Sequence, residues 1–330
     1  MSKPRIHPVV WQPPRAPARA RQRSSTTRFD LQVVDLPGVG PEDVAVDAHG
    51  SAITGLSDGR IMRVARDGGI EQLTDTKGRP MGIERLPDGA LIVCDAYRGL
   101  LRIGRNREDI EVLVDSFESR PLRFCNNATV GRDGSIYFTD SSTEFGVDHY
   151  KADLFAHTGT GRLFRWTAES GVELLAGGLD FANGVTLSAA EDFLVFAETS
   201  GYRLQRIWLG GPRDGVREIF VDNLPGFPDN LSTGDSGLIW VALPNARNRL
   251  LDGLLPRPPV LRKLAWAAPE LLQPKEKSTV WAQAYNSDGV LVHDLQTTHP
   301  GFRMVTGVRE FEGSLWLGSL AARAIGRITL

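Results

Sequence analysis

Cysteine is scarce in this chain of 330 residues, and long apolar runs are absent. Cys94 and Cys125 are too few for a disulfide framework or a zinc cluster, so we expect two reduced, buried thiols. No stretch has the roughly 18 apolar residues that a membrane-spanning helix needs. Arg and Pro interrupt the beginning of the sequence, where a signal peptide would have its apolar segment. These features predict a cytoplasmic protein that does not contact membranes.

An excess of charge of one sign is also lacking. The 38 basic residues nearly balance the 40 acidic ones, and the net charge of -2 gives no sign of nucleic-acid binding. Turn-forming residues are abundant, with 35 Gly and 20 Pro. That density favours many short strands over long helices, so we expect an all-β fold.

The first 27 residues have a different composition from the rest. Between Pro13 and Arg23 the chain alternates Pro, Ala and Arg, which cannot build a core. We therefore predict that residues 1–27 form a disordered, solvated Pro/Arg-rich arm.

From Val39 onward one pattern recurs six times, with a polar or small residue, alternating apolar positions, a turn and a second apolar strand. Turns such as Asp88-Gly89 and Asp133-Gly134 are strong hairpin signals. The copies predict that residues 28–330 form a single six-bladed β-propeller. The segment Phe29–Leu36 is expected to supply the strand that the last copy lacks, which closes the ring and removes free sheet edges.

Two insertions interrupt the repeats, near residues 141–161 and 247–279. The second contains leucines at helical spacing before Pro256, so it is expected to be partly helical. Each insertion follows the second strand of its repeat. We therefore expect the two to form a lid over one face of the propeller.

The first residue of each copy is expected to lie near the propeller axis. These positions hold Glu42, Met81, Asn126, Asn183, Asp229 and Thr306. Four of them offer a carboxylate or amide oxygen, and an oxygen-only set favours a hard cation such as Ca²⁺ over Zn²⁺ or Cu²⁺. Turn formation explains one such residue, but it does not explain four at equivalent positions. The sequence therefore predicts a central metal site, with Ca²⁺ as the first choice and another divalent cation as the alternative.

The run Pro225–Asn230, together with Asn126-Asn127, Asn183-Gly184 and Ala197-Glu198-Thr199, resembles the strictosidine-synthase-like branch of calcium propellers. The chain is also similar to gluconolactonases and senescence-marker proteins and, more distantly, to paraoxonases. The resemblance runs from Val39 to Leu330. It implies a substrate pocket above the metal and calcium ligands at Glu42, Asn126, Asn183 and Asp229, with Asn230 as a further ligand.

Two positions depart from these families. The resemblance puts Met81 where paraoxonases have a catalytic His, and Thr306 where strictosidine synthase has a catalytic Glu. Neither side chain is a useful acid or base at neutral pH. The gluconolactonase-like mechanism remains, in which the metal polarises a carbonyl and Asp229 is the catalytic residue that positions water. Met81, Thr306 and His149 are then expected in the substrate pocket.

These inferences predict a calcium-dependent hydrolase of small esters or lactones whose partner is a small-molecule substrate. Two alternatives remain open. One is a strictosidine-synthase-like condensing or cyclising enzyme of secondary metabolism, and the other is a binding propeller with a structural metal. A Ser-His-Asp triad is not expected, because Ser141 and Ser142 lack the glycines of a nucleophile elbow.

Overall fold

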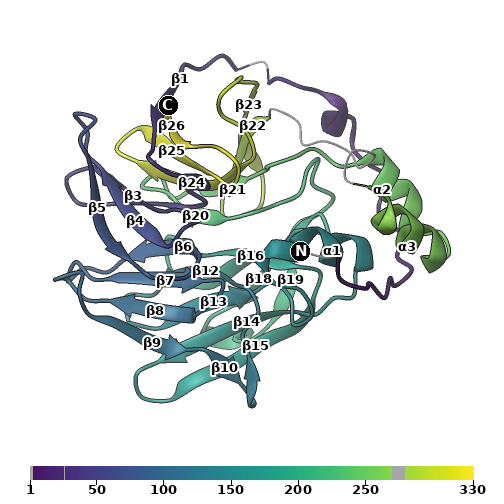
Figure 1. Ribbon diagram of the computed structural model, residues 1–330, viewed down its shortest axis with the longest axis horizontal. Coiled ribbons are helices and arrows are strands. Elements are labelled where there is room, and N and C mark those ends of the chain that lie inside the picture. Colours follow the sequence, from purple (N-terminus) through teal and green to yellow (C-terminus); the bar gives the residue numbers. More distant parts are fainter. Residues whose placement is uncertain (1–2, 26, 270–278) are drawn as a thin grey trace.

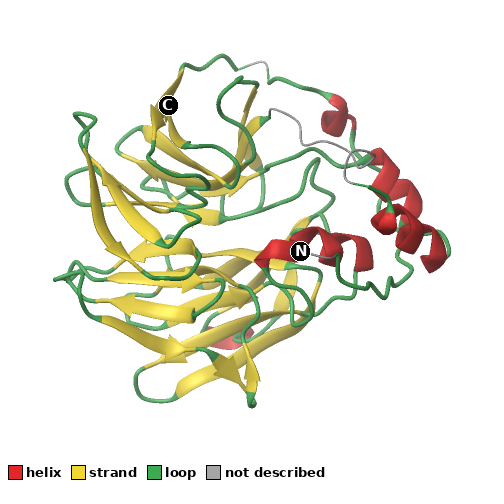
Figure 2. Cartoon of the chain, in the orientation of Figure 1, coloured by secondary structure: helices red, strands yellow, loops and turns green. Residues whose placement is uncertain are grey.

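The computed structural model of the chain describes residues 3–25, 27–269 and 279–330. Its strands form six four-stranded antiparallel sheets, which follow one another around the molecule (Figures 1 and 2). The first strand of each sheet contacts the first strands of the two neighbouring sheets, and β24 contacts β2. The sheets therefore form a closed six-bladed propeller, as predicted.

The blades follow the order of the chain. Blade 1 contains β2 (Val44–Val46), β3 (Ala52–Gly55), β4 (Arg60–Val64) and β5 (Ile70–Asp75). Blade 2 contains β6 (Pro80–Arg85), β7 (Leu91–Asp95), β8 (Gly99–Ile103) and β9 (Ile110–Val114). A small hairpin of β10 (Ser116–Phe117) and β11 (Arg120–Pro121) precedes blade 3, which contains β12 (Cys125–Val130), β13 (Ile136–Asp140), β14 (Gly161–Thr167) and β15 (Gly171–Leu179).

The second half of the ring has the same design. Blade 4 contains β16 (Ala182–Leu187), β17 (Phe193–Glu198), β18 (Arg203–Trp208) and β19 (Arg217–Val221), with the short helix η3 (Gly211–Arg213) before its last strand. Blade 5 contains β20 (Leu231–Thr233), β21 (Ile239–Ala242), β22 (Val280–Tyr285) and β23 (Leu291–Thr297). Blade 6 contains β24 (Val305–Phe311), β25 (Ser314–Ser319), β26 (Ala324–Thr329) and β1 (Leu31–Asp35).

Blade 6 is completed by the two ends of the chain. Strand β1 pairs antiparallel with β26, from Leu31 opposite Ile328 to Asp35 opposite Ala324. Leu31 and Val33 also pack against the apolar cluster between blades 5 and 6. The strand expected within Phe29–Leu36 is thus confirmed as the one that closes the ring.

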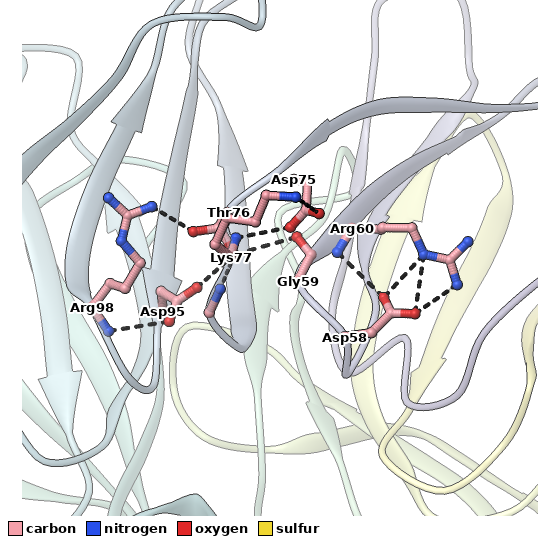
Figure 3. Close-up of polar contacts among 9 residues, drawn as sticks. Asp58, Gly59, Arg60, Asp75, Thr76, Lys77, Asp95 and Arg98 are labelled. Atoms are coloured by element: carbon pink, nitrogen blue, oxygen red, sulfur yellow. Dashed lines mark hydrogen bonds and ion pairs between the residues drawn. The ribbon is translucent and has the colours of Figure 1, made fainter.

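The second strands of blades 2, 3 and 4 are completely buried, because neighbouring blades cover both of their faces. Each ends in a carboxylate that holds the loop entering its own blade. In blade 2, Asp95 accepts hydrogen bonds from Thr76 Oγ1 at 2.8 Å and from the Arg79 backbone at 2.9 Å. Figure 3 shows this junction beside the exposed pairs Asp58–Arg60 and Asp75–Lys77.

A buried carboxylate at the end of the second strand has the same role in blades 3 and 4. Asp140 accepts from the Phe124 backbone at 2.7 Å and pairs with Arg162 at 2.6 Å. Glu198 accepts from the Asp180 backbone at 2.8 Å and pairs with Arg203 at 2.7 Å. Since these carboxylates are fully buried, their hydrogen bonds offset the cost of removing them from water. They fix each loop at the point where it turns toward the axis.

The arm differs from the disordered tail expected from its composition. Val9 donates a backbone hydrogen bond to Ala156, and Trp11 donates one to Leu255. Farther along, the short helix η1 (Ala18–Arg21) places Arg19 against Asp294 and over the ring of Trp281. In Figure 1 this purple segment runs past α2 and α3 to β1. The described part of the arm is ordered because backbone groups and a few side chains, rather than a core of its own, attach it to the propeller.

The two insertions contain helices, and they contact each other. The first holds η2 (Val147–His149) and α1 (Tyr150–Ala156), and the second holds α2 (Arg249–Leu254) and α3 (Pro259–Ala267). Helix α1 contacts α3, and fully buried Arg262 of α3 donates to the carbonyls of Phe155 and Val9. Residues 270–278 of the predicted insertion lie outside the described residues.

Candidate active site on the propeller axis

The first residues of the six repeats meet at one pocket. Its volume is about 830 Å³. Its lining includes Glu42, Met81, Asn126, Asn183, Asp229 and Thr306, which we call the floor. The pseudo-symmetry of the sequence therefore brings together all six residues that it predicted to share the axis.

The backbone of the inner strands is irregular at the floor. In blades 2, 3, 4 and 6 the pairing of the first strand with the second shifts register at the floor residue and the one after it. In blade 3, for example, the shift lies between Cys125 and Ala128 and so includes Asn126 and Asn127. Such bulges change the direction of side chains and are common beside active sites. Here they coincide with the residues that line the pocket.

The residue after each floor position alternates between a polar side chain and glycine around the ring. In blade order these residues are Asp43, Gly82, Asn127, Gly184, Asn230 and Gly307. A Cβ at Gly82 would lie 2.7 Å from Asn127 Cα, and one at Gly307 would lie 2.7 Å from Asp43 Cα. The glycines therefore allow the inner strands to approach closely. Sequence reasoning missed this alternation, although it is visible in the aligned repeats.

The polar members of this second ring connect one blade to another. Asp43 accepts a hydrogen bond from the backbone of Ile83 at 3.2 Å, and Asn127 accepts one from Val185 at 2.9 Å. Asn230 instead donates to Glu42 Oε2 at 2.9 Å. Asn230, predicted as a further ligand, is not part of the pocket lining, and its amide N–H positions Glu42. Its Oδ1 is buried without a hydrogen-bond partner among the described residues, so its role as a ligand stays a prediction.

Two carboxylates, those of Glu42 and Asp229, share the floor, and neither forms an ion pair with a basic side chain among the described residues. Burial, Asp229 and Asp43 together raise the pKa of Glu42 well above its usual range, and the Asn230 hydrogen bond and Arg79 oppose this only in part. Burial raises the pKa of Asp229 to about 8. A bound dication would reverse both shifts, because opposite charge favours the ionised form.

The two floor asparagines are oriented with their amide oxygens unpaired. Asn126 donates its amide to Ser141 Oγ at 2.8 Å, and Asn183 donates to Thr199 Oγ1 at 3.0 Å. Their Oδ1 atoms are buried and have no hydrogen-bond partner among the described residues. A buried unpaired acceptor costs about 1–3 kcal/mol, so these oxygens favour a donor or a cation.

This donor set fits a hard divalent cation. No group of three or more His, Cys, Asp or Glu side chains suited to a metal occurs among the described residues. A cation on this floor would therefore use the two carboxylates and the two amide oxygens, which matches Ca²⁺ better than Zn²⁺.

Met81 and Thr306 lie on the floor without an acid–base role. Met81 packs in an apolar cluster with Phe124 and Phe181. The Thr306 hydroxyl donates to the backbone carbonyl of Glu42 at 2.7 Å, so it supports the position of that residue. Their surroundings agree with the expectation that neither supplies a proton or accepts one.

The histidines of the first insertion lie outside the pocket lining. His149, expected in the substrate pocket, is half-buried at the beginning of α1. His157 is stacked under Trp11 with ring centroids 4.2 Å apart, and burial lowers its pKa to about 4. Spacing alone could not show which side of the insertion faces the axis.

Irregular segments build the remaining walls, which we call the roof. Residues 12–16, 20, 21 and 23 of the arm line the pocket, as do parts of α1 and residues 244–254. Apolar side chains line the same pocket: Phe124 and Phe181 pack with Met81 of the floor, and Phe227 packs with Leu251. Sequence reasoning missed the contribution of the arm, because its composition carries no strand or helix pattern.

Known proteins are similar to this chain in sequence. The family model described as strictosidine synthase matches residues 126–212, and a strictosidine synthase-like N-terminal model matches residues 30–64. The adipocyte plasma membrane-associated protein of Mus musculus is 32% identical, with 88% of this chain and 75% of that protein covered. Strictosidine synthase-like protein 6 of Arabidopsis thaliana is 33% identical, with 87% and 80% covered.

Solved structures with low sequence identity show the same fold. A gluconolactonase of Xanthomonas campestris has a TM-score of 0.67 at 17% identity and covers 100% of this chain and 98% of its own. A calcium-binding regucalcin of Agrobacterium tumefaciens has a TM-score of 0.65 at 16% identity, with 92% and 94% covered. Although some relatives are named for a membrane, the described part of this chain has no helix long and apolar enough to cross one.

Proposed function

Because this chain belongs to the strictosidine synthase-like family, we propose that its axial pocket binds one divalent cation, preferably Ca²⁺, and hydrolyses small esters or lactones. One observation carries the proposal. Two carboxylates and two unpaired amide oxygens, from four different blades, line the floor of one pocket. The gluconolactonase and regucalcin folds support the same interpretation.

In such a reaction the residues of the pocket would have separate roles. The cation, when bound, would polarise the substrate carbonyl and stabilise the oxyanion that forms. Asp229 retains partial exposure to the pocket, so it can hold a water molecule and accept its proton. Asn230 and Thr306 hold Glu42 in place, and Asn126 and Asn183 are oriented by Ser141 and Thr199. The phenylalanines of the lining would offer an apolar surface to the substrate.

A carboxylate beside a dication is a weak base, because the positive charge lowers its pKa. The reaction should therefore favour activated esters and strained lactones, in which the leaving group needs little protonation. The alternative of a condensing or cyclising enzyme finds no acid–base group at position 306, where the hydroxyl is already bonded to Glu42.

A panel of aryl esters and lactones, assayed with Ca²⁺ and with EDTA, tests the proposal. We expect turnover that disappears with EDTA and returns with added Ca²⁺. Turnover that EDTA leaves unchanged contradicts the metal-dependent mechanism. Calcium-dependent melting without any turnover would instead support the binding propeller with a structural metal.

A further inference from the structure

The pocket lining has an excess of basic side chains. Among the described residues it holds six, namely Arg15, Arg21, Arg23, Lys151, Arg247 and Arg249, against the three carboxylates Glu42, Asp229 and Asp252. The arm and α2 supply most of the arginines, whereas Glu42 and Asp229 belong to the floor. The two ends of the pocket therefore differ in charge.

We call the part of the pocket lined by the arm and residues 244–254 the rim. Asp252 and Arg247 form an ion pair there. Asp252 accepts from Tyr202 at 2.8 Å and pairs with Arg247 at 3.2 Å. Arg247 is buried and also donates to Asn223 Oδ1 and to the carbonyl of Pro14. Arg247 thus attaches the arm to the second insertion, and the described pocket lining holds no other carboxylate near the remaining arginines.

Four arginines of the rim therefore have no carboxylate partner among the described residues. Arg15, Arg21, Arg23 and Arg249 are exposed, and the described residues offer their guanidinium groups no hydrogen bond or ion pair. Exposed arginines are common on protein surfaces, but these four line one pocket together with apolar side chains. Of these, Phe181 packs with Met81 of the floor and Phe227 packs with Leu251 of α2. Arginine favours carboxylate and phosphate groups, which match its planar donor geometry.

We propose that the substrate is an amphiphilic anion. Its ester or lactone group lies at the floor, its apolar body lies against the phenylalanines, and its carboxylate or phosphate meets the arginines of the rim. This inference rests on the proposed hydrolysis for its kinetic test, and it adds the class of molecule that the pocket selects. The arm thereby becomes part of substrate recognition.

A matched pair of esters tests the selection. 4-Nitrophenyl hexanoate is neutral, and mono-4-nitrophenyl adipate has the same chain length but ends in a carboxylate. We expect the parent protein to prefer the adipate ester, and the ratio of the two kcat/KM values to fall about tenfold in Arg15→Ala/Arg21→Ala/Arg23→Ala, mainly through KM. Arg249→Ala should lower the ratio in the same direction, and added NaCl should lower it in the parent protein.

Arg105→Ala serves as the control, because Arg105 is an exposed arginine on the turn between β8 and β9, away from the pocket lining. It should leave the ratio unchanged. If the triple variant loses activity equally on both esters, the arm has only a structural role and the inference is wrong. Equal activity of the parent protein on both esters also overturns it.

Binding measurements separate this inference from the proposed function. Calorimetry with octanoate, octyl phosphate and 1-octanol needs no turnover, and the two anions show which headgroup is preferred. We expect at least one anion to bind more tightly than 1-octanol, and the triple variant to weaken that binding about tenfold. If neither ester is hydrolysed but this pattern is seen, the hydrolase proposal fails alone. If 1-octanol binds as tightly as both anions, the inference fails whatever the enzyme does.

Discussion

The floor of the pocket comes from positions repeated around the propeller axis, whereas the roof comes from segments that occur once in the chain. Floor residues lie at register shifts of the inner strands, and the glycines beside them let neighbouring blades approach closely. Roof residues are held by separate hydrogen bonds, such as those of Arg247 and Arg262. In a site of this design, changes in the roof would alter which substrate enters and leave the proposed metal ligands of the floor in place.

The largest effect should come from the floor. Asp229→Asn keeps an oxygen ligand but removes the base and one charge, so we expect a loss of about a hundredfold or more in turnover. The comparison must be made at a Ca²⁺ concentration that saturates both proteins. Turnover equal to that of the parent protein would show that Asp229 acts only as a ligand.

The inner strands at the floor and the helix α2 of the roof should respond differently to a Gly→Ala substitution. A Cβ at Gly184, next to floor residue Asn183, would lie 2.5 Å from the carbonyl oxygen of Asp229, so Gly184→Ala should destabilise the protein by about 1–3 kcal/mol and weaken Ca²⁺ binding. Gly253 of α2 has open space around its Cβ position. Gly253→Ala should be neutral or stabilise by up to about 1 kcal/mol. Urea unfolding of both variants checks the contrast, which fails if the two changes have equal effects.

Calcium should change both the stability and its dependence on pH. At about a hundredfold excess over its dissociation constant, Ca²⁺ should stabilise the fold by about 2.7 kcal/mol. Without the metal, Asp229 has a pKa of about 8 in the folded protein and an ordinary one when unfolded, so the folded state binds more protons between these values. Metal-free stability should therefore fall as pH rises from about 4 to about 8. Melting curves with EDTA and with Ca²⁺ across this range test both effects, and curves that coincide contradict the metal site.

The smallest effect should come from the part of the arm beside the roof. Trp11 stacks on His157 and donates its backbone N–H to Leu255. Trp11→Ala should cost about 1 kcal/mol, in line with the loss of one aromatic pair, and leave Ca²⁺ affinity within about twofold. Chemical unfolding and calcium titration provide the two measurements. A large loss of Ca²⁺ affinity would show that roof and floor are coupled.

The contrast also explains what the sequence could predict. The blades and the floor follow from patterns that recur, so Glu42, Asn126, Asn183 and Asp229 can be aligned with one another by their place in the repeat. The order of the arm could not be foreseen, because it depends on contacts with residues far away in sequence, such as Arg19 with Asp294. The orientation of His149 depends likewise on how the insertion packs. The alternation that begins with Asp43 and Gly82 was readable, but its meaning required the distances between strands.

The pairing of Leu31 with Ile328 has a consequence for the order of folding. Contacts between residues so far apart in the chain carry the greatest loop-closure entropy, and they form late. Five blades can assemble from local hairpins while the chain is still being synthesised, but the sixth must wait for β26. The arm immediately precedes β1, so its final position in the pocket lining also depends on that last pairing. The pocket, whose lining includes both the floor and the arm, would therefore be completed only when the ring closes.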